Sequence, residues 1–321
     1  MNDRHRCMSL NVTSLTVAHI TDVENSNQLK VIRACYGLCS LIRINIKRVV
    51  MIEIEPITPY IGARIHGIDL ANCTAEDLEA IYQALIEHQV IFFDGQAMSP
   101  EQQLELAQYF GGLEPAHPFF PNVESSPQVS IIETTKGNAP LESYWHTDLT
   151  WREQPSKGAV LHAQHVPNTG GDTIWVSMTA VFDALDNTMK TKLRQLSATH
   201  SLTAFEEVAE EDIELDWHHR LLEVSHLHPP VVHPVIKIHP ETGKETLFIN
   251  EQFTRHINEV GHTEGKQLLN ELFAIVRQPE YQVRFKWQPG SVAIWDNRCT
   301  QHYAVIDYGD QPRKMHRVTF V

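Results

Sequence analysis

Short strand patterns recur along most of this 321-residue chain with few helices between them, and this limits the folds open to it. Apolar or alternating runs bounded by Gly and Pro are the expected strands, at 129–133, 144–148, 158–162, 172–177, 231–238, 246–249, 281–286, 291–295, 298–305 and 315–321. A parallel α/β sheet would need a helix between successive strands. The pattern therefore predicts a mainly β fold, a sandwich or barrel with flanking helices packed outside.

The expected helices have clear ends. Thr74 is an N-cap ahead of a helix that runs to residue 88, and Ser99 caps a second helix that ends before Gly111. Further helical segments are expected as two helices within 178–196, one helix at 263–274, and an acidic, helical-looking segment at 205–223.

Residues 1–50 differ in charge from the rest of the chain. They hold seven Lys and Arg against three Asp and Glu, a net charge of +4, whereas residues 51–321 carry −18. Strand-like alternation starts only at Met51. Two interpretations stay open: an N-terminal extension that is disordered or loosely docked, or an over-extended gene prediction whose natural start is Met51. In both, the expected folded domain is 51–321.

Composition excludes several classes of protein. The net charge of −14 argues against a nucleic-acid partner, because phosphate backbones are bound by concentrated basic surfaces. The five cysteines are odd in number and contain no CxxC pair, which indicates reduced thiols in a cytoplasmic protein. No run of about 18 apolar residues is present, so we expect no membrane span.

Candidate chemistry begins with the tripeptide His146-Thr147-Asp148. The two outer residues are two positions apart, so on a strand both side chains leave the same face and can converge on one metal ion. An iron(II) site of the two-histidine, one-carboxylate kind needs one further histidine. His302, which closes a second cluster at 294–302, is the candidate for that third ligand.

Two arginines near the C-terminus suggest anion binding. Arg313 follows His302 by 11 residues, enough for a strand to end, turn and return past the same site. Its planar guanidinium suits a bidentate grip on a carboxylate. Arg313 and Arg317 are four apart on an expected strand, so both project to one face and can serve two anions in one cavity. The rival pair His162 and His165 lacks a carboxylate at matching spacing and is interpreted as solvated.

From about residue 57 to 320 the chain resembles the taurine/2-oxoglutarate dioxygenase family of iron(II) enzymes. The segments that carry the resemblance are HQVIFF at 88–93, WHTD at 145–148, TGGDT at 169–173, LFINEQFT at 247–254 and IWDNRCTQHYA at 294–304. Several segments in the same order are far more specific than one HxD tripeptide. The resemblance implies a double-stranded β-helix, the cupin-like jelly roll, with iron at one open end, and makes 51–321 the catalytic domain.

The resemblance also implies the site residues and the reaction. Position by position, it matches His146, Asp148 and His302 to the iron(II) ligands, Thr173 and Arg313 to the contacts of the cosubstrate 2-oxoglutarate, His117 and Arg317 to the sulfonate-binding pair, and Phe253 to an apolar wall of the substrate pocket. The implied reaction uses O2 to hydroxylate taurine or a similar small alkanesulfonate next to sulfur. It releases sulfite and an aldehyde, with succinate and CO2. Relatives are commonly dimers or tetramers, so a homo-oligomer is expected.

Two substrate-facing positions depart from the family pattern. Phe120 stands where taurine-specific relatives have tyrosine, and Glu142 where they have an asparagine near the amine. The lost hydroxyl removes a polar contact, whereas the carboxylate still accepts from an ammonium group. Dioxygenases of alkyl sulfates or of aryloxyalkanoates share the iron and cosubstrate residues and are the alternative, although the segment 250–254 favours the sulfonate branch. A zinc-dependent hydrolase or a non-catalytic jelly-roll binding protein would need no cosubstrate site at Arg313 and Thr173.

Overall fold

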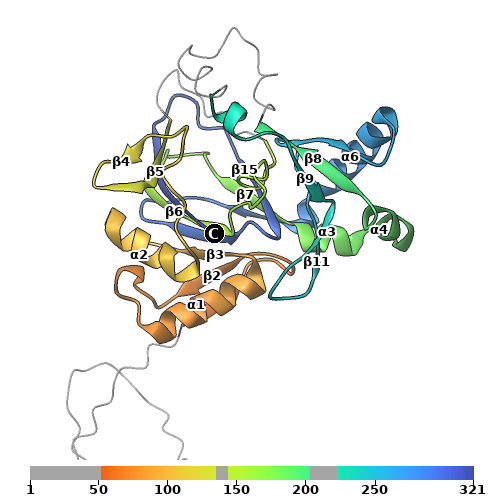
Figure 1. The fold of residues 1–321 in the computed structure, drawn as a ribbon. Coiled ribbons are helices and arrows are strands. Elements are labelled where there is room, and N and C mark those ends of the chain that lie inside the picture. The colour runs from red at the N-terminus through yellow and green to blue at the C-terminus, as the bar shows by residue number, and fades with distance from the viewer. Residues whose placement is uncertain (1–51, 135–143, 203–222) are drawn as a thin grey trace, which may run out of the picture. The chain divides into compact units, whose positions relative to one another are not determined.

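The computed structural model describes residues 52–134, 144–202 and 223–321 (Figure 1). The predicted extension, residues 1–50, lies outside these ranges, and so does Glu142. None of the helices in this described part of the chain combines the length and the apolar character that a membrane crossing requires.

Within the described residues the larger sheet has eight strands. Their order across the sheet is β1 (Glu53–Pro56), β2 (Ala63–His66), β3 (Val90–Phe93), β14 (Val292–Asp296), β6 (Gly158–His165), β16 (Arg313–Phe320), β5 (Ser126–Thr134) and β4 (Asn122–Val123). All neighbours are antiparallel except β2 and β3. Strand β16 lies between β6 and β5, so its two arginines belong to the interior of the sheet and not to an edge.

A smaller antiparallel sheet faces the larger one. It consists of β13 (Gln282–Phe285), β7 (Thr173–Ser177) and β15 (Thr300–Ala304), with β7 in the middle. Aromatic side chains fill the space between the sheets: the rings of Phe92 and Phe285 stack with centroids 4.2 Å apart, and those of Trp175 and Trp295 lie 5.8 Å apart. This face-to-face packing of two antiparallel sheets is the predicted double-stranded β-helix.

Two helices cover the outer face of the larger sheet, below it in the view of Figure 1: α1 (Ala75–His88) and α2 (Pro100–Phe110). Both begin with the predicted N-caps, because Thr74 and Ser99 each form a capping box with the residue three positions on. Phe110 packs on Phe320 of β16 with ring centroids 5.5 Å apart. The helices therefore close the outer core while the inner face stays turned to the smaller sheet.

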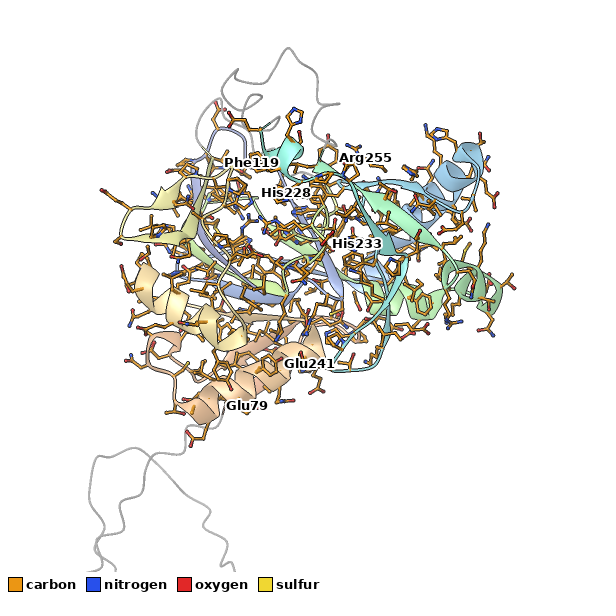
Figure 2. All side chains as sticks on the ribbon, viewed as in Figure 1. Glu79, Phe119, His228, His233, Glu241 and Arg255 are labelled. Carbon is orange, nitrogen blue, oxygen red and sulfur yellow. The ribbon has the colours of Figure 1, made fainter. Side chains whose placement is uncertain are left out.

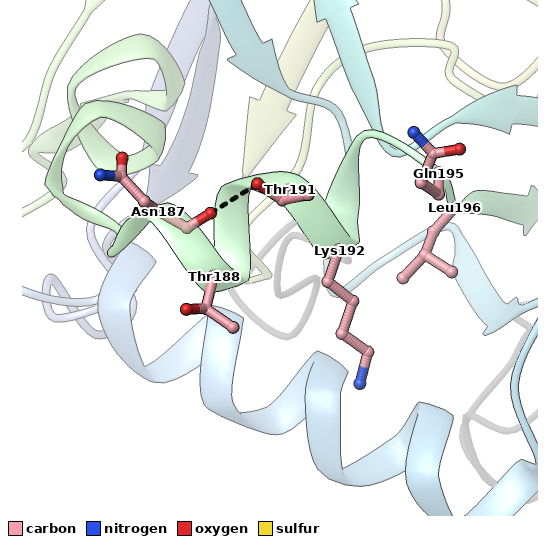
Figure 3. Close-up of a pocket in the computed structure, with 6 residues that line it drawn as sticks. All are labelled: Asn187, Thr188, Thr191, Lys192, Gln195 and Leu196. Atoms are coloured by element: carbon pink, nitrogen blue, oxygen red, sulfur yellow. Dashed lines mark hydrogen bonds between the residues drawn. The ribbon is translucent and has the colours of Figure 1, made fainter.

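Most of the remaining elements flank the smaller sheet. They are α3 (Met178–Ala184), α4 (Asn187–Leu193), α6 (His262–Val276), the strands β12 (Thr254–Ile257), β8 (Ser197–His200) and β9 (Val231–Pro234) of one small sheet, β10 (Ile236–Ile238) and β11 (Glu245–Leu247) of another, and the short 3-10 turn Pro279–Tyr281. A second 3-10 turn, Leu70–Asn72, packs against α2 instead. An open groove beside α4 is lined by Asn187, Thr188, Thr191, Lys192, Gln195 and Leu196 (Figure 3). Lys192 pairs there with Glu264 of α6 at 2.9 Å. None of the groove residues belongs to the predicted site.

The structure differs from the predicted strands in several places. The predicted strand at 144–148 is wrong: within it only His146 makes a β-bridge, and the chain turns at Leu149, whose φ is 58°. The strand predicted at 231–238 is two strands that pair with different partners on either side of Val235. Strands β8 and β12 were not predicted, and the acidic segment at 205–223 lies almost wholly outside the described residues.

Candidate metal centre

The predicted two-ligand segment is attached to the smaller sheet by one β-bridge. The His146 amide donates to the carbonyl of His302 at 3.1 Å, and the His302 amide donates back at 2.8 Å. The Thr147 hydroxyl donates to the carbonyl of Thr300 at 2.7 Å. These contacts hold the segment against β15, so two histidines 156 positions apart in the sequence face each other with ring centroids 4.1 Å apart.

The three predicted ligands converge. Asp148 Oδ1 lies 3.8 Å from His146 Nε2 and 4.0 Å from His302 Nε2. One ligand atom from each of the three residues lies within 4.8 Å of the other two, and all three side chains are buried. A carboxylate oxygen between two imidazole nitrogens is the donor set of the two-histidine, one-carboxylate iron site.

The protonation states suit metal binding. His146 Nδ1 lies 2.8 Å from the carbonyl of Tyr144, which can only accept, so Nδ1 carries a proton and Nε2 is the nitrogen that faces Asp148. Burial, assisted by His146, lowers the pKa of His302 to about 3 and leaves this ring neutral. Burial raises the pKa of Asp148, but the charge of the Arg317 guanidinium, helped by the hydrogen bond from Asn297, acts against it, and the pKa is lowered to about 2. Two imidazoles and one ionised carboxylate therefore fit a divalent metal.

A second buried group, His239, Asp296 and Cys299, has its donors already engaged. His239 lies 3.0 Å from Asp296 Oδ2, and Arg298 grips the same carboxylate through Nε at 2.8 Å and Nη2 at 2.5 Å. Burial raises the pKa of the Cys299 thiol well above its usual value, so it stays protonated. A guanidinium paired with the only carboxylate leaves no place for a cation, and this cluster is a structural network.

Arg317, His117 and Phe120 gather beside Asp148. Arg317 Nη1 donates to Asp148 Oδ1 at 3.3 Å, and its guanidinium carbon lies 5.1 Å from the centroid of the Phe120 ring. The His117 and Phe120 ring centroids are 4.6 Å apart. Burial, followed by the charge of Arg317, lowers the pKa of His117 to about 3, and the Phe119 amide donates to His117 Nδ1 at 3.2 Å. His117 is thus a neutral Nε2–H donor next to a cation, an arrangement suited to an anion.

Phe253 lies on the other side of His146, with ring centroids 6.4 Å apart. It belongs to a buried apolar cluster with Leu149, Trp151, Leu202 and Val224, against which Phe119 (Figure 2) packs. A turn fixes its position: the Phe253 amide donates to Asn250 Oδ1, and the Asn250 amide donates to Thr254 Oγ1, both at 2.8 Å. The turn at 250–254 therefore holds the apolar Phe253 side chain next to His146.

Thr173 and Arg313 line the inner walls, one on each sheet. Thr173 begins β7, and its hydroxyl accepts from Trp287 Nε1 at 2.9 Å. Arg313 begins β16 opposite Thr134 of β5, and it is 7% exposed. Glu142, the remaining predicted contact, lies outside the described residues.

Asn297 was given no role by the sequence. Its Nδ2 donates to Asp148 Oδ2 at 3.4 Å and to Ser156 Oγ at 2.9 Å, while its Oδ1 accepts from Trp295 Nε1 at 2.8 Å. Its position within the segment 294–304, which carries the family resemblance, was the available signal.

Trp295 and His162 are both buried, which bears on two predictions. Trp295 is part of the core, as predicted. His162 is also buried and hydrogen-bonded to Gln96 and Gln164, so the interpretation of His162 as a solvated residue is wrong.

Comparison with known proteins gives consistent matches over the described domain. Residues 53–319 match the family described as "Taurine catabolism dioxygenase TauD, TfdA family". An alkylsulfatase from Acinetobacter baylyi is 35% identical over 271 residues, 84% of this chain and 84% of that protein. An alpha-ketoglutarate-dependent sulfate ester dioxygenase from Pseudomonas putida is 34% identical over 272 residues, 84% of this chain and 89% of that protein. Among solved structures, a taurine dioxygenase from Burkholderia xenovorans has a TM-score of 0.72 at 31% identity, over 84% of this chain and 89% of that one.

Proposed function

This chain belongs to the taurine catabolism dioxygenase TauD, TfdA family of 2-oxoglutarate-dependent dioxygenases, and we propose that it uses iron(II) to hydroxylate a short alkyl sulfate ester at the carbon that carries the sulfate. The names of the two curated relatives support a sulfate ester as the substrate. The arrangement of the described site supports an anionic head group with an apolar tail, for the reasons that follow.

His146, Asp148 and His302 would hold the iron, because they offer two imidazole nitrogens and an ionised carboxylate within 4.8 Å of one another. Iron(II), together with 2-oxoglutarate and O2, supplies the oxidising power for hydroxylation. Arg313 and Thr173 would hold the far carboxylate of 2-oxoglutarate. Both are buried on facing sheets, so this ion pair would form away from water, where it is stronger than at the surface.

The single observation that carries the substrate proposal is the contact set of Arg317. Its guanidinium donates to Asp148 and lies over the Phe120 ring, and His117 lies beside the same ring, with the two ring centroids 4.6 Å apart. A sulfate group bound there has its ester carbon next to the metal ligands. The apolar side chains of Phe120 and Phe253 then suit an alkyl chain better than the ammonium group of taurine.

The proposed products follow from the position of the new hydroxyl group. Hydroxylation of the carbon that bears the sulfate gives a hemiacetal-type ester, which breaks its carbon–oxygen bond to sulfate and leaves an aldehyde. One atom of O2 enters this product, and the other enters succinate as 2-oxoglutarate loses CO2. Inorganic sulfate is therefore the diagnostic product.

An alkanesulfonate, including taurine, is the second candidate. The solved taurine dioxygenase shares the fold of this chain, and the turn at 250–254 that positions Phe253 belongs to the sequence pattern that favours sulfonates. Hydroxylation of a sulfonate next to sulfur releases sulfite instead of sulfate, so the two candidates differ in a product that is easy to measure.

The test begins with an anaerobic titration of iron(II) and 2-oxoglutarate, which should produce a weak visible charge-transfer band. Aerobic reactions with hexyl sulfate, hexanesulfonate and taurine then compare succinate, sulfate and sulfite. We expect kcat/KM for hexyl sulfate to exceed that for taurine by about tenfold or more, because the hexyl chain packs against the side chains of Phe120 and Phe253 and the short polar chain of taurine does not. A preference for taurine would assign the sulfonate instead. Folded protein that gives neither band nor succinate refutes the iron(II) proposal.

A further inference from the structure

Asn297 occupies the turn between β14 and β15 and makes three side-chain contacts in the interior. It accepts from Trp295 and donates to Asp148 and to Ser156, and all four of these residues are buried. One of these contacts, the one with Asp148, directs the side-chain amide at one oxygen of a predicted metal ligand.

The chemistry of its neighbours fixes which end of the amide faces Asp148. An indole N–H is only a donor, so the atom 2.8 Å from Trp295 Nε1 must be the amide oxygen. The NH2 group then points toward the carboxylate and the Ser156 hydroxyl, both of which accept. The contact with Asp148 is long, at 3.4 Å, and the shorter contact with Trp295, at 2.8 Å, orients the amide.

The two oxygens of Asp148 have different surroundings. Oδ2 faces Asn297, whereas Oδ1 faces His146 Nε2, His302 Nε2 and Arg317. We propose that Asn297 is a positioning residue that holds Oδ2 back, so that Asp148 binds the metal through Oδ1 alone. Single-oxygen ligation leaves a coordination position open that a bidentate carboxylate would fill. This inference rests on the metal site of the proposed function.

Hydrogen bonds from neighbouring residues hold the turn that carries Asn297. The backbone N–H of Asn297 donates to the carbonyl of Lys157 at 2.9 Å. The carboxylate of Asp296 accepts from the backbone N–H and from the side chain of Arg298. Arg298 also donates to Glu241 (Figure 2) at 2.6 Å. Glu241 in turn accepts from Tyr82 of α1 at 2.6 Å. The second buried cluster thus anchors the turn to α1, and Asn297 is the one side chain of the turn that reaches Asp148.

The test measures metal binding without turnover. Cobalt(II) is titrated into metal-free wild type, Asn297→Ala and the matched control Ser156→Ala, which removes the other acceptor of the same amide. We expect Asn297→Ala to weaken cobalt(II) binding by about tenfold or more, the usual effect of removing a partner of a metal ligand. Ser156→Ala should stay within about threefold of wild type. Metal-induced infrared difference spectra should change from a monodentate to a bidentate carboxylate pattern in Asn297→Ala only.

The outcomes separate the two proposals. Wild-type protein that binds no cobalt(II) refutes the metal site itself. Wild type that binds, with Asn297→Ala showing the same affinity and the same infrared pattern, refutes only the role of Asn297. Equal losses in Asn297→Ala and Ser156→Ala would mean a general structural role and would also refute it. If Asn297→Ala does not fold, Asn297→Leu keeps the volume without the donor and takes its place.

Discussion

Substituting the two buried arginines of β16 one at a time should distinguish the binding site of the organic substrate from that of 2-oxoglutarate. Arg317→Ala removes a guanidinium that is 4% exposed, so an organic anion bound to it has lost most of its water. A hydrogen bond to a charged group contributes about 1.5–3 kcal/mol, and 1.4 kcal/mol corresponds to tenfold. We therefore expect KM for hexyl sulfate to rise by about 10- to 150-fold, while KM for 2-oxoglutarate changes by less than about threefold. Arg313→Ala should give the opposite result.

Arg317→Ala should also affect metal binding, because Arg317 is the strongest of the charges that lower the pKa of Asp148. Its removal raises that pKa and weakens metal binding as well. Arg317→Lys is the control, since it keeps the charge and loses only the forked geometry. Succinate formation with one substrate varied at a time gives both KM values, and cobalt(II) titration gives the metal affinity. Equal effects of the Arg313 and Arg317 changes on both KM values would refute the assignment of the two sites.

Three further predictions concern specificity, stability and pH. Phe120→Tyr restores a hydroxyl next to Arg317 and should shift the ratio of kcat/KM values by about tenfold toward taurine over hexyl sulfate; an unchanged ratio would contradict a contact at this position. Arg298→Ala leaves the buried Asp296 carboxylate without its cation and should lower the free energy of unfolding by about 3–5 kcal/mol in urea denaturation, against less than about 1 kcal/mol for the exposed Arg194→Ala. In metal-free protein, burial lowers the pKa of His200 and of His302 from 6.5 to about 3. Between these values the unfolded chain takes up protons that the folded chain does not, so the free energy of unfolding should fall as the pH drops from about 6.5 toward about 3. Urea midpoints that do not change with pH would contradict this prediction.

The local elements were predictable where local signals suffice. The helices α1 and α2 begin at the predicted caps because a side chain three residues from the N-cap completes each box. Strands β8 and β12 escaped prediction because their pairing partners are far apart in sequence and their apolar pattern is short. The failed strand at 144–148 has a similar cause. One bridge to His302 positions His146, and a left-handed residue, Leu149, then ends the extended backbone.

The candidate site, too, was predictable only in part. Its residue types could be inferred from motifs, and the convergence of His146, Asp148 and His302 confirms the geometric part of that prediction. The roles of Thr173 and Arg313 in cosubstrate binding stay predictions, as does a dimer or tetramer.

The sequence by itself determined the donor chemistry of this protein, because imidazole, carboxylate and guanidinium groups are properties of residue type, and their spacing indicates which can share a face. Only the tertiary structure decided how they act together. The β-bridge brings His302 to His146 across 156 residues, and the interior removes the water that would otherwise keep His302 protonatable near neutral pH. It also assigned the two oxygens of Asp148 to different neighbours, Asn297 on one side and the imidazoles on the other. Such contacts depend on desolvation and long-range packing, which no local pattern records.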